Sequence, residues 1–173
     1  MINFQARTLR QLVALSALMG SGCDTTSPMA GFEESLTRTG GCGDMVLFAV
    51  DEDDEVMLRL DIEGLLTAVN MEPSDTEHVL PEVGLALVVE VGEQISDATC
   101  DDAIENGGPQ VDRVYIATAG TAWISTRPTD SGSPEASADL LLEDVIFEDE
   151  ATGEILNLES FEITDAFVGW VAG

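Results

Sequence analysis

The chain has 173 residues, of which 34 are acidic and 6 are basic, and its formal net charge is -28. A surface this negative repels phosphate backbones and anionic lipid headgroups, which excludes nucleic acid as a partner. The hydrophobic fraction of 45% is typical of a globular protein, so we expect the acidic side chains to coat a folded core rather than to form a disordered tail.

The chain opens with the plan of an export signal. Arg7 and Arg10 are the only charges before an apolar run at residues 12–19. That run is shorter than the roughly 20 residues with which a helix spans a bilayer, which favours a cleaved signal over a permanent anchor. The six basic residues are all arginine, so cleavage after residue 22 would leave four arginines against 34 acids, a formal charge of -30.

Small residues at positions 20–22 directly precede Cys23. This arrangement resembles the cleavage box of bacterial lipoproteins, with Gly20 at the position where that class usually has leucine. The resemblance covers residues 1–23 and implies that the Cys23 thiol is diacylated and becomes the mature N-terminus. It predicts an exported protein that a lipid anchors to a membrane of the bacterial cell envelope, on the periplasmic or the cell-surface side. The alternative is an ordinary secretory signal that is cut nearby and leaves Cys23 as a spare thiol.

Two cysteines, Cys42 and Cys100, are left once Cys23 is assigned to the lipid. An even number of cysteines in an exported domain predicts a disulfide. The alternative is a catalytic thiolate or a zinc ligand. It is disfavoured because His78 is the only histidine and no second ligand stands at a metal-like spacing.

Residues 23–40 are polar, which predicts a tether between the lipid and a single domain at residues 41–173. That domain consists of short apolar runs, and several of them alternate apolar and polar residues with the period of two that is typical of half-buried strands. The runs lie at residues 44–50, 55–62, 83–91, 111–118, 121–126, 138–149, 154–163 and 165–171.

These runs predict seven to nine strands and no long helix. Ala119 and Gly120 are the candidate turn of a hairpin, and residues 63–69 are expected to form at most a turn or two of helix. Short strands separated by glycine, proline and acidic clusters favour an all-β fold, an antiparallel β-sandwich. A closed β-barrel is the alternative, because the number of strands does not distinguish the two.

Few catalytic templates fit the residues present. Without lysine there is no phosphate-binding loop of the P-loop type, and a Ser-His-Asp triad would have to use His78, which we expect to be a surface residue at a loop-to-strand junction. A pair of carboxylates, as in glycoside hydrolysis, is the one arrangement left, and it needs an aromatic platform for the sugar. The aromatic residues best suited to stacking are Tyr115, Trp123 and Trp170, and we expect the two tryptophans to pack in the core or at a sheet edge.

Two acidic clusters are candidate Ca²⁺ sites. Asp101, Asp102, Glu105 and Asn106 lie on a glycine-rich loop next to Cys100 and offer the hard oxygen ligands that Ca²⁺ prefers. The weaker candidate is the cluster at 51–55, which lacks the glycine and the distal glutamate of an EF-hand loop. Its ligands would be Asp51, Asp53 and Asp54. For both clusters the alternative is a solvated acidic surface.

The sequence therefore predicts a lipid-anchored envelope protein whose domain has a binding or structural role and no catalytic activity, with a protein or a glycan as its partner. A calcium-stabilised adhesion or carbohydrate-binding module and a carboxylate-pair glycoside hydrolase are the alternatives. An aromatic-lined cleft with two inward-facing acids would indicate the hydrolase, whereas an exposed sheet face or strand edge would indicate a binding module.

Overall fold

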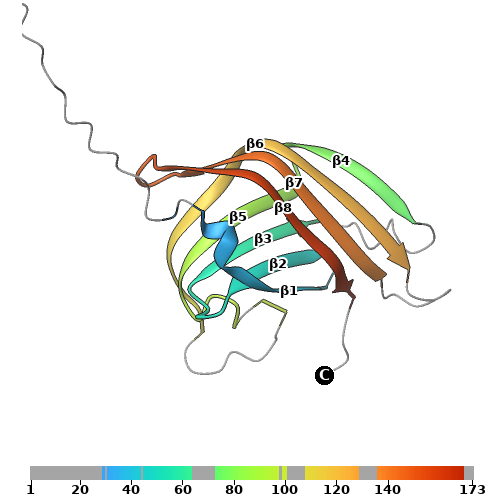
Figure 1. Cartoon of the computed structure of the whole chain (residues 1–173), viewed down its shortest axis with the longest axis horizontal. Coiled ribbons are helices and arrows are strands. Elements are labelled where there is room, and N and C mark those ends of the chain that lie inside the picture. The colour runs from blue at the N-terminus through green and yellow to red at the C-terminus, as the bar shows by residue number, and fades with distance from the viewer. Residues whose placement is uncertain are drawn as a thin grey trace, which may run out of the picture.

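The computed structural model describes residues 29, 31–43, 45–63, 73–97, 99–100, 108–128 and 136–169. These residues form an all-β, antiparallel fold, as predicted, and the eight strands lie within the expected range of seven to nine (Figure 1). The elements are η1 (Phe32–Ser35), β1 (Leu36–Cys42), β2 (Val46–Asp51), β3 (Val56–Ile62), β4 (Ser74–Leu80), β5 (Leu85–Glu93), β6 (Gln110–Pro128), β7 (Ala136–Asp149) and β8 (Ile155–Val168). Within the described ranges no helix is long and apolar enough to cross a membrane.

All eight strands belong to one sheet, in the order β1-β2-β3-β5-β6-β7-β8, and β4 pairs with β6 beside this path. The sheet curls until its two end strands meet, where the amide of Gly43 donates to the carbonyl of Gly169 over 2.9 Å. No ladder joins β1 to β8 in the described part of the chain. The fold is therefore a nearly closed barrel, which corresponds to the barrel alternative.

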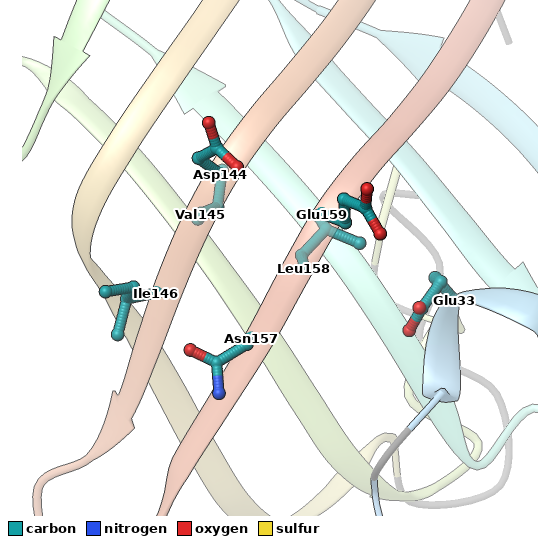
Figure 2. Close-up of a pocket in the computed structure, with 7 residues that line it drawn as sticks. All are labelled: Glu33, Asp144, Val145, Ile146, Asn157, Leu158 and Glu159. Carbon is teal, nitrogen blue, oxygen red and sulfur yellow. The ribbon is translucent and has the colours of Figure 1, made fainter.

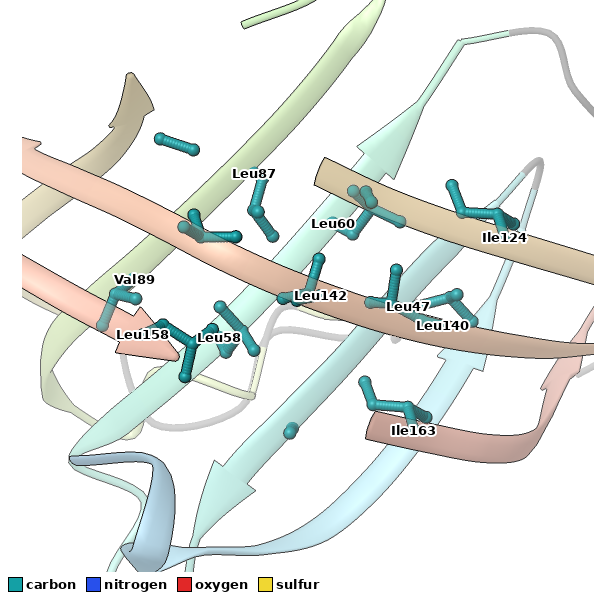
Figure 3. Packing of buried hydrophobic residues seen from close by; sticks show 14 of the residues in the cluster. Leu47, Leu58, Leu60, Leu87, Val89, Ile124, Leu140, Leu142, Leu158 and Ile163 are labelled. Atoms are coloured by element: carbon teal, nitrogen blue, oxygen red, sulfur yellow. The ribbon is translucent and has the colours of Figure 1, made fainter. Parts of the chain in front are cut away.

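The core lies inside the curl, where side chains from the two halves of the sheet face each other (Figure 3). Alternate residues of each strand point inward, as the period of two predicts. The half formed by β2, β3 and β5 contributes Leu47, Leu58, Leu60, Leu87 and Val89, and the half formed by β6, β7 and β8 contributes Ile124, Leu140, Leu142, Leu158 and Ile163. Each of these side chains is at most 2% exposed.

The hairpin predicted at Ala119 and Gly120 is wrong, because residues 110–128 form the single strand β6. β7 pairs with both halves of β6 and its register shifts between Ala117 and Thr121. Gly120 has a φ of 123°. The glycine bends one long strand at a bulge instead of ending it. β8 similarly joins the run predicted at 154–163 to part of the next one, up to Val168.

The fold begins earlier than the predicted boundary at residue 41. η1 and β1 lie within the expected tether, and Phe32 is 5% exposed. Its ring meets that of Phe147 edge to face, with 6.3 Å between the centroids. The polar residues of 31–40 belong to a short 3-10 helix and to β1, the first strand in the order of the sheet. The tether predicted from composition is therefore too long. Apart from Glu63, the turn expected at residues 63–69 lies outside the described residues.

The structure contains the predicted disulfide between Cys42 and Cys100, with 5.6 Å between the Cα atoms. Cys100 ends a segment, residues 94–97 and 99–100, that we call the strap. The strap lies against β3 and the turn before it. The amide of Ile95 donates to the carbonyl of Asp54 in that turn, and the hydroxyl of Thr99 contacts the sulfur of Met57 in β3. Ile95 is 2% exposed and forms a second small apolar cluster with Val50 and Met57. The disulfide thus fixes the end of a segment that covers part of the outer face of the sheet.

Candidate binding surface

The most distinctive exposed side chain is that of Trp123, which lies on the outer face of the long central strand β6. The ladders place Glu77 of β4 opposite Trp123 on one side and Leu141 of β7 on the other, and Leu141 is paired in turn with Glu162 of β8. Directly paired residues share one face of a sheet, so these four side chains form a row across four strands. We call this row, together with Glu143, the Trp123 face.

Trp123 is 40% exposed, and β6 is paired there with β4 on one side and β7 on the other, so the prediction that it packs in the core or at a sheet edge is wrong. Its neighbours Ala122 and Ile124 are fully buried, and alternation along β6 turns the residue between them outward. The indole Nε1 donates a hydrogen bond to Oε2 of Glu143 over 2.9 Å, which fixes the edge of the ring. The alternation of residues 121–126 was the one sequence signal for this exposure.

The carboxylates of the Trp123 face have no cationic partner among the described residues. Glu77, Glu143 and Glu162 are exposed, and no ion pair joins any of them to an arginine in the described part of the chain. Along the ladder of β6 and β7, the ion pair that lies nearest to Trp123 joins Arg127 to Asp139. The amide of Asp165 and the Arg127 guanidinium lower the pKa of Asp139, so this pair is satisfied within the fold.

All four arginines of the domain are engaged by acids. Their partners are Asp54 for Arg38, Asp61 and Glu90 for Arg59, Asp149 and Glu154 for Arg113, and Asp139 for Arg127. The only histidine is also bonded to an acid. In the described ranges no arginine is therefore paired with an acid of the Trp123 face, and the negative charge of this face is directed toward solvent.

β4 forms one border of the Trp123 face. Its residues Asp75, Glu77 and Val79 are exposed and alternate with inward-facing Thr76 and His78. His78 was predicted to be a surface residue at the start of a strand, but it lies inside β4 with a side chain only 15% exposed. Its ring nitrogens contact Oε2 of Glu82 at 2.9 Å and the hydroxyl of Thr76 at 3.1 Å. Both ring nitrogens are therefore hydrogen-bonded within the fold, which indicates a structural role for His78.

A second charged cluster lies at the turn between β7 and β8. The Arg113 guanidinium contacts the buried Asp149 carboxylate at 2.8 Å and stacks 4.7 Å above the ring centroid of Tyr115, which is fully buried. The other oxygen of Asp149 accepts hydrogen bonds from the amides of Ala151 and Thr152. The bonds from Arg113 and from the turn lower the pKa of Asp149 to about 2. Burial raises the pKa of Tyr115. The cluster therefore fastens the turn between β7 and β8.

Two surface hollows lie elsewhere on the barrel. The larger, of about 490 Å³, lies between η1, β7 and β8. Figure 2 shows Glu33 on η1, facing Glu159 and Asn157 on β8, with Asp144 and Ile146 on β7. The smaller, of about 380 Å³, borders Arg113 and the turn after β7. Neither hollow is lined by an aromatic side chain, so neither provides the sugar platform that the hydrolase alternative requires.

The acids of the 51–55 cluster have roles within a turn. One carboxylate oxygen of Asp51 accepts the amides of Glu55 and Val56 at 2.8 and 3.0 Å, and Asp54 pairs with Arg38 at 3.3 Å. Asp53 is exposed. Among the described residues, no group of three or more histidine, cysteine or acidic side chains could hold a metal ion.

The other predicted site residues lie outside the described residues. They are Cys23, Trp170 and the four residues of the stronger Ca²⁺ candidate, Asp101, Asp102, Glu105 and Asn106. Lipidation at Cys23 and calcium binding at residues 101–106 therefore stay predictions.

No family model matches the chain, and no curated protein or solved structure compared with it is similar.

Proposed function

We propose that the chain is a lipid-anchored protein of the bacterial cell envelope whose barrel is a binding module without catalytic activity. The observation that carries the binding role is the Trp123 face, where an exposed indole lies among carboxylates that pair with no arginine of the described residues. Large aromatic side chains at protein surfaces are typical of binding sites, because they bury much area at little cost in conformational entropy.

The disulfide supports the export part of this proposal. Cys42 and Cys100 are bonded, and disulfides persist in oxidising compartments such as the periplasm and the cell surface. The signal-like residues 1–22 and the lipoprotein-like Cys23 point to the same compartment.

The early start of the fold shortens the tether. Met29 packs against the core, and it follows Cys23 by six positions. Six extended residues span about 20 Å at most. If the lipid is attached at Cys23, the barrel is held close to the membrane surface, and its partners are other molecules of the same membrane or of the adjacent wall and periplasm.

Binding is favoured over catalysis by the distribution of aromatic and acidic side chains. A carboxylate-pair hydrolase needs two acids beside an aromatic platform in a cleft, whereas Trp123 lies on the outer face of a sheet. A carbohydrate-binding module shares the exposed aromatic, so a glycan stays the alternative ligand of the Trp123 face.

The anchor is tested by expressing the full chain in bacteria and separating membranes from soluble protein. We expect the wild-type chain in the membrane fraction, with a mass that shows the loss of residues 1–22 and the addition of acyl chains. Cys23→Ser should release the barrel as a soluble protein. A wild-type product that is soluble and begins at another residue would refute the anchor.

The binding role is tested by placing a photo-cross-linking amino acid at position 125. Ser125 lies two residues from Trp123 along β6, on the same face of the sheet, and is paired with Asp75 of β4. The control position is Thr152, which is exposed on the turn between β7 and β8. We expect adducts in living cells from position 125 and none from position 152, with loss of the adducts in Trp123→Ala. Equal labelling from both positions, or none from position 125, would contradict binding at this face.

A further inference from the structure

β4 is a border strand with one partner. It pairs with β6 from Ser74 opposite Thr126 to Leu80 opposite Gly120, while β5 takes the same side of β6 only from Val88 onward. In Figure 1, β4 lies at the upper right margin, where β5 and the strands beyond it have turned away. Across the described ranges, no strand pairs with the second edge of β4. Such an edge presents a row of backbone N–H and C=O groups that another extended chain can pair with.

The side chains of β4 determine which kind of extended chain could pair with this edge. Asp75 and Glu77 are exposed on its outer face, and Glu77 is the direct neighbour of Trp123. A second copy of this chain would bring the same acids and a net charge of -28, so like charges oppose pairing between copies. Charges on an edge strand are a known protection against aggregation, and they also select a partner of opposite charge.

We infer that the free edge of β4 and the Trp123 face together bind an extended, basic segment of a partner protein, which adds to β4 as a further strand. This inference rests on the proposed binding function of the Trp123 face. Successive side chains of a strand alternate between faces, so every second residue of the added segment lies beside Asp75 and Glu77. Arginine or lysine at these positions pairs with the two carboxylates, and its long side chain extends over Glu77 toward the indole, where a cation is attracted to the ring.

The edge favours a polypeptide over a glycan. Main-chain hydrogen bonds along β4 are available to a peptide in register but have no counterpart in a sugar chain. The carboxylates of Glu77, Glu143 and Glu162 add attraction for cations, since the four arginines among the described residues pair with other acids. A neutral glycan could donate hydroxyl hydrogen bonds to these carboxylates, but it carries no charge for them to attract.

The test uses tryptophan emission as the reporter. Trp123 and Trp170 are the only tryptophans, so Trp170→Phe assigns the signal to Trp123. The probes are an eight-residue peptide of alternating threonine and arginine, the same peptide with glutamate for arginine, and a neutral oligosaccharide. We expect saturable binding of the arginine peptide with a shift in Trp123 emission, weaker binding at higher salt, and no response to the other two probes.

Backbone methylation separates strand addition from simple charge attraction. In a strand, the N–H groups of alternate residues point to opposite sides, so only one alternate set faces β4. One peptide is methylated at the backbone nitrogen of every arginine, and another at the backbone nitrogen of every threonine. The charge of the peptide is the same in both. We expect one of the two to bind about tenfold more weakly or worse, the effect of losing one or two net hydrogen bonds, and the other to keep its affinity.

Substitutions locate the segment on the barrel. Asp75→Asn combined with Glu77→Gln should weaken binding of the arginine peptide by about threefold or more, the range of partly exposed ion pairs. The matched control, Asp112→Asn with Glu148→Gln, removes the same charge from exposed positions on β6 and β7 and should have a smaller effect.

Equal binding by both methylated peptides, or equal effects of the two double substitutions, would overturn strand addition at β4. A response to the oligosaccharide without one to the arginine peptide would also overturn it. These outcomes leave the binding role standing if position 125 still yields adducts in cells. Without adducts at that position, the binding role itself fails, whatever the peptide does in solution.

Discussion

The Arg113 guanidinium lies 2.8 Å from the Asp149 carboxylate, and this carboxylate also accepts two amides of the turn that joins β7 to β8. The ion pair therefore links β6 to the turn. Asn at position 149 would keep an oxygen for the turn amides but would lose the charge that holds Arg113. We expect Asp149→Asn to lower the melting temperature at pH 7 by several degrees. The control is Asp112→Asn, which removes an exposed acid near the start of β6 and should change the melting temperature little.

The contribution of Asp149 depends on pH with a defined sign. Its folded pKa is about 2, below the ordinary value of about 3.9 in an unfolded chain. The folded state therefore binds this proton less readily, and the stabilisation is present above the unfolded pKa and lost as the pH falls toward 2. The difference in melting temperature between wild type and Asp149→Asn should shrink across that window. A difference that stays constant down to pH 2 would contradict the role assigned to the ion pair.

The disulfide between Cys42 and Cys100 should contribute a large share of the stability. It joins residues 58 positions apart, and a loop of that size corresponds to about 4 kcal/mol in the chain-entropy model. Cys42→Ser combined with Cys100→Ser should lower the free energy of unfolding in urea by about that amount. Because the strap is then held only by contacts such as that of Thr99 with Met57, limited proteolysis should cut it first. Cys23→Ser is the control, and stability equal to wild type in the double variant would refute the constraint.

Local patterns in the sequence predicted six of the eight strands, β2, β3 and β5 to β8, but they missed β1 and β4, divided β6 into two strands and did not reveal which strands pair. The period of two in residues 55–62 identifies β3 correctly, because alternation depends only on neighbouring residues. The continuity of β6 depends on its pairing with β7, which no local pattern reveals, so Gly120 resembled a turn. The closure of the sheet is set in the same way by contacts between its first and last strands.

The binding surface was harder to predict for the same reason. Glu77 and Trp123 are neighbours through the register of β4 with β6, although 46 positions separate them in the sequence. Their proximity could not be derived without knowing that β4 does not pair with β5, the next strand in the chain, but with the second half of β6. The alternation of residues 121–126 was the only local indication that Trp123 points outward, and the burial of Ala122 and Ile124 agrees with it.

Gly120 provides a test of the bend in β6. A Cβ at this position would lie 2.7 Å from the Cα of Val145, and the φ of 123° is unfavourable for any residue with a side chain. Gly153 also has a positive φ, 72°, but nothing lies within 4 Å of its added Cβ. We expect Gly153→Ala to cost about 1 kcal/mol, from the backbone alone. Gly120→Ala should cost about 3 kcal/mol or more, because the contact with β7 adds to the backbone cost. Equal losses in urea denaturation would show that the bend tolerates a side chain.

The net charge should make stability depend on salt. The chain has 34 acidic and 6 basic residues, so many carboxylates lie within one Debye length of each other, about 10 Å at 0.1 M salt, and the unfolded chain escapes part of that repulsion. Sodium chloride should therefore raise the melting temperature steadily. A specific Ca²⁺ site at residues 101–106 would add an increment that Mg²⁺ at equal ionic strength does not produce. This increment grows with the logarithm of the Ca²⁺ concentration above the dissociation constant, since binding to the folded state alone stabilises it by RT ln(1 + [L]/Kd). Asp101→Asn with Asp102→Asn should remove that increment, whereas Asp53→Asn with Asp54→Asn should retain it. Equal shifts with both cations, unchanged by either pair, would eliminate the calcium site, and a melting temperature indifferent to sodium chloride would contradict the repulsion itself.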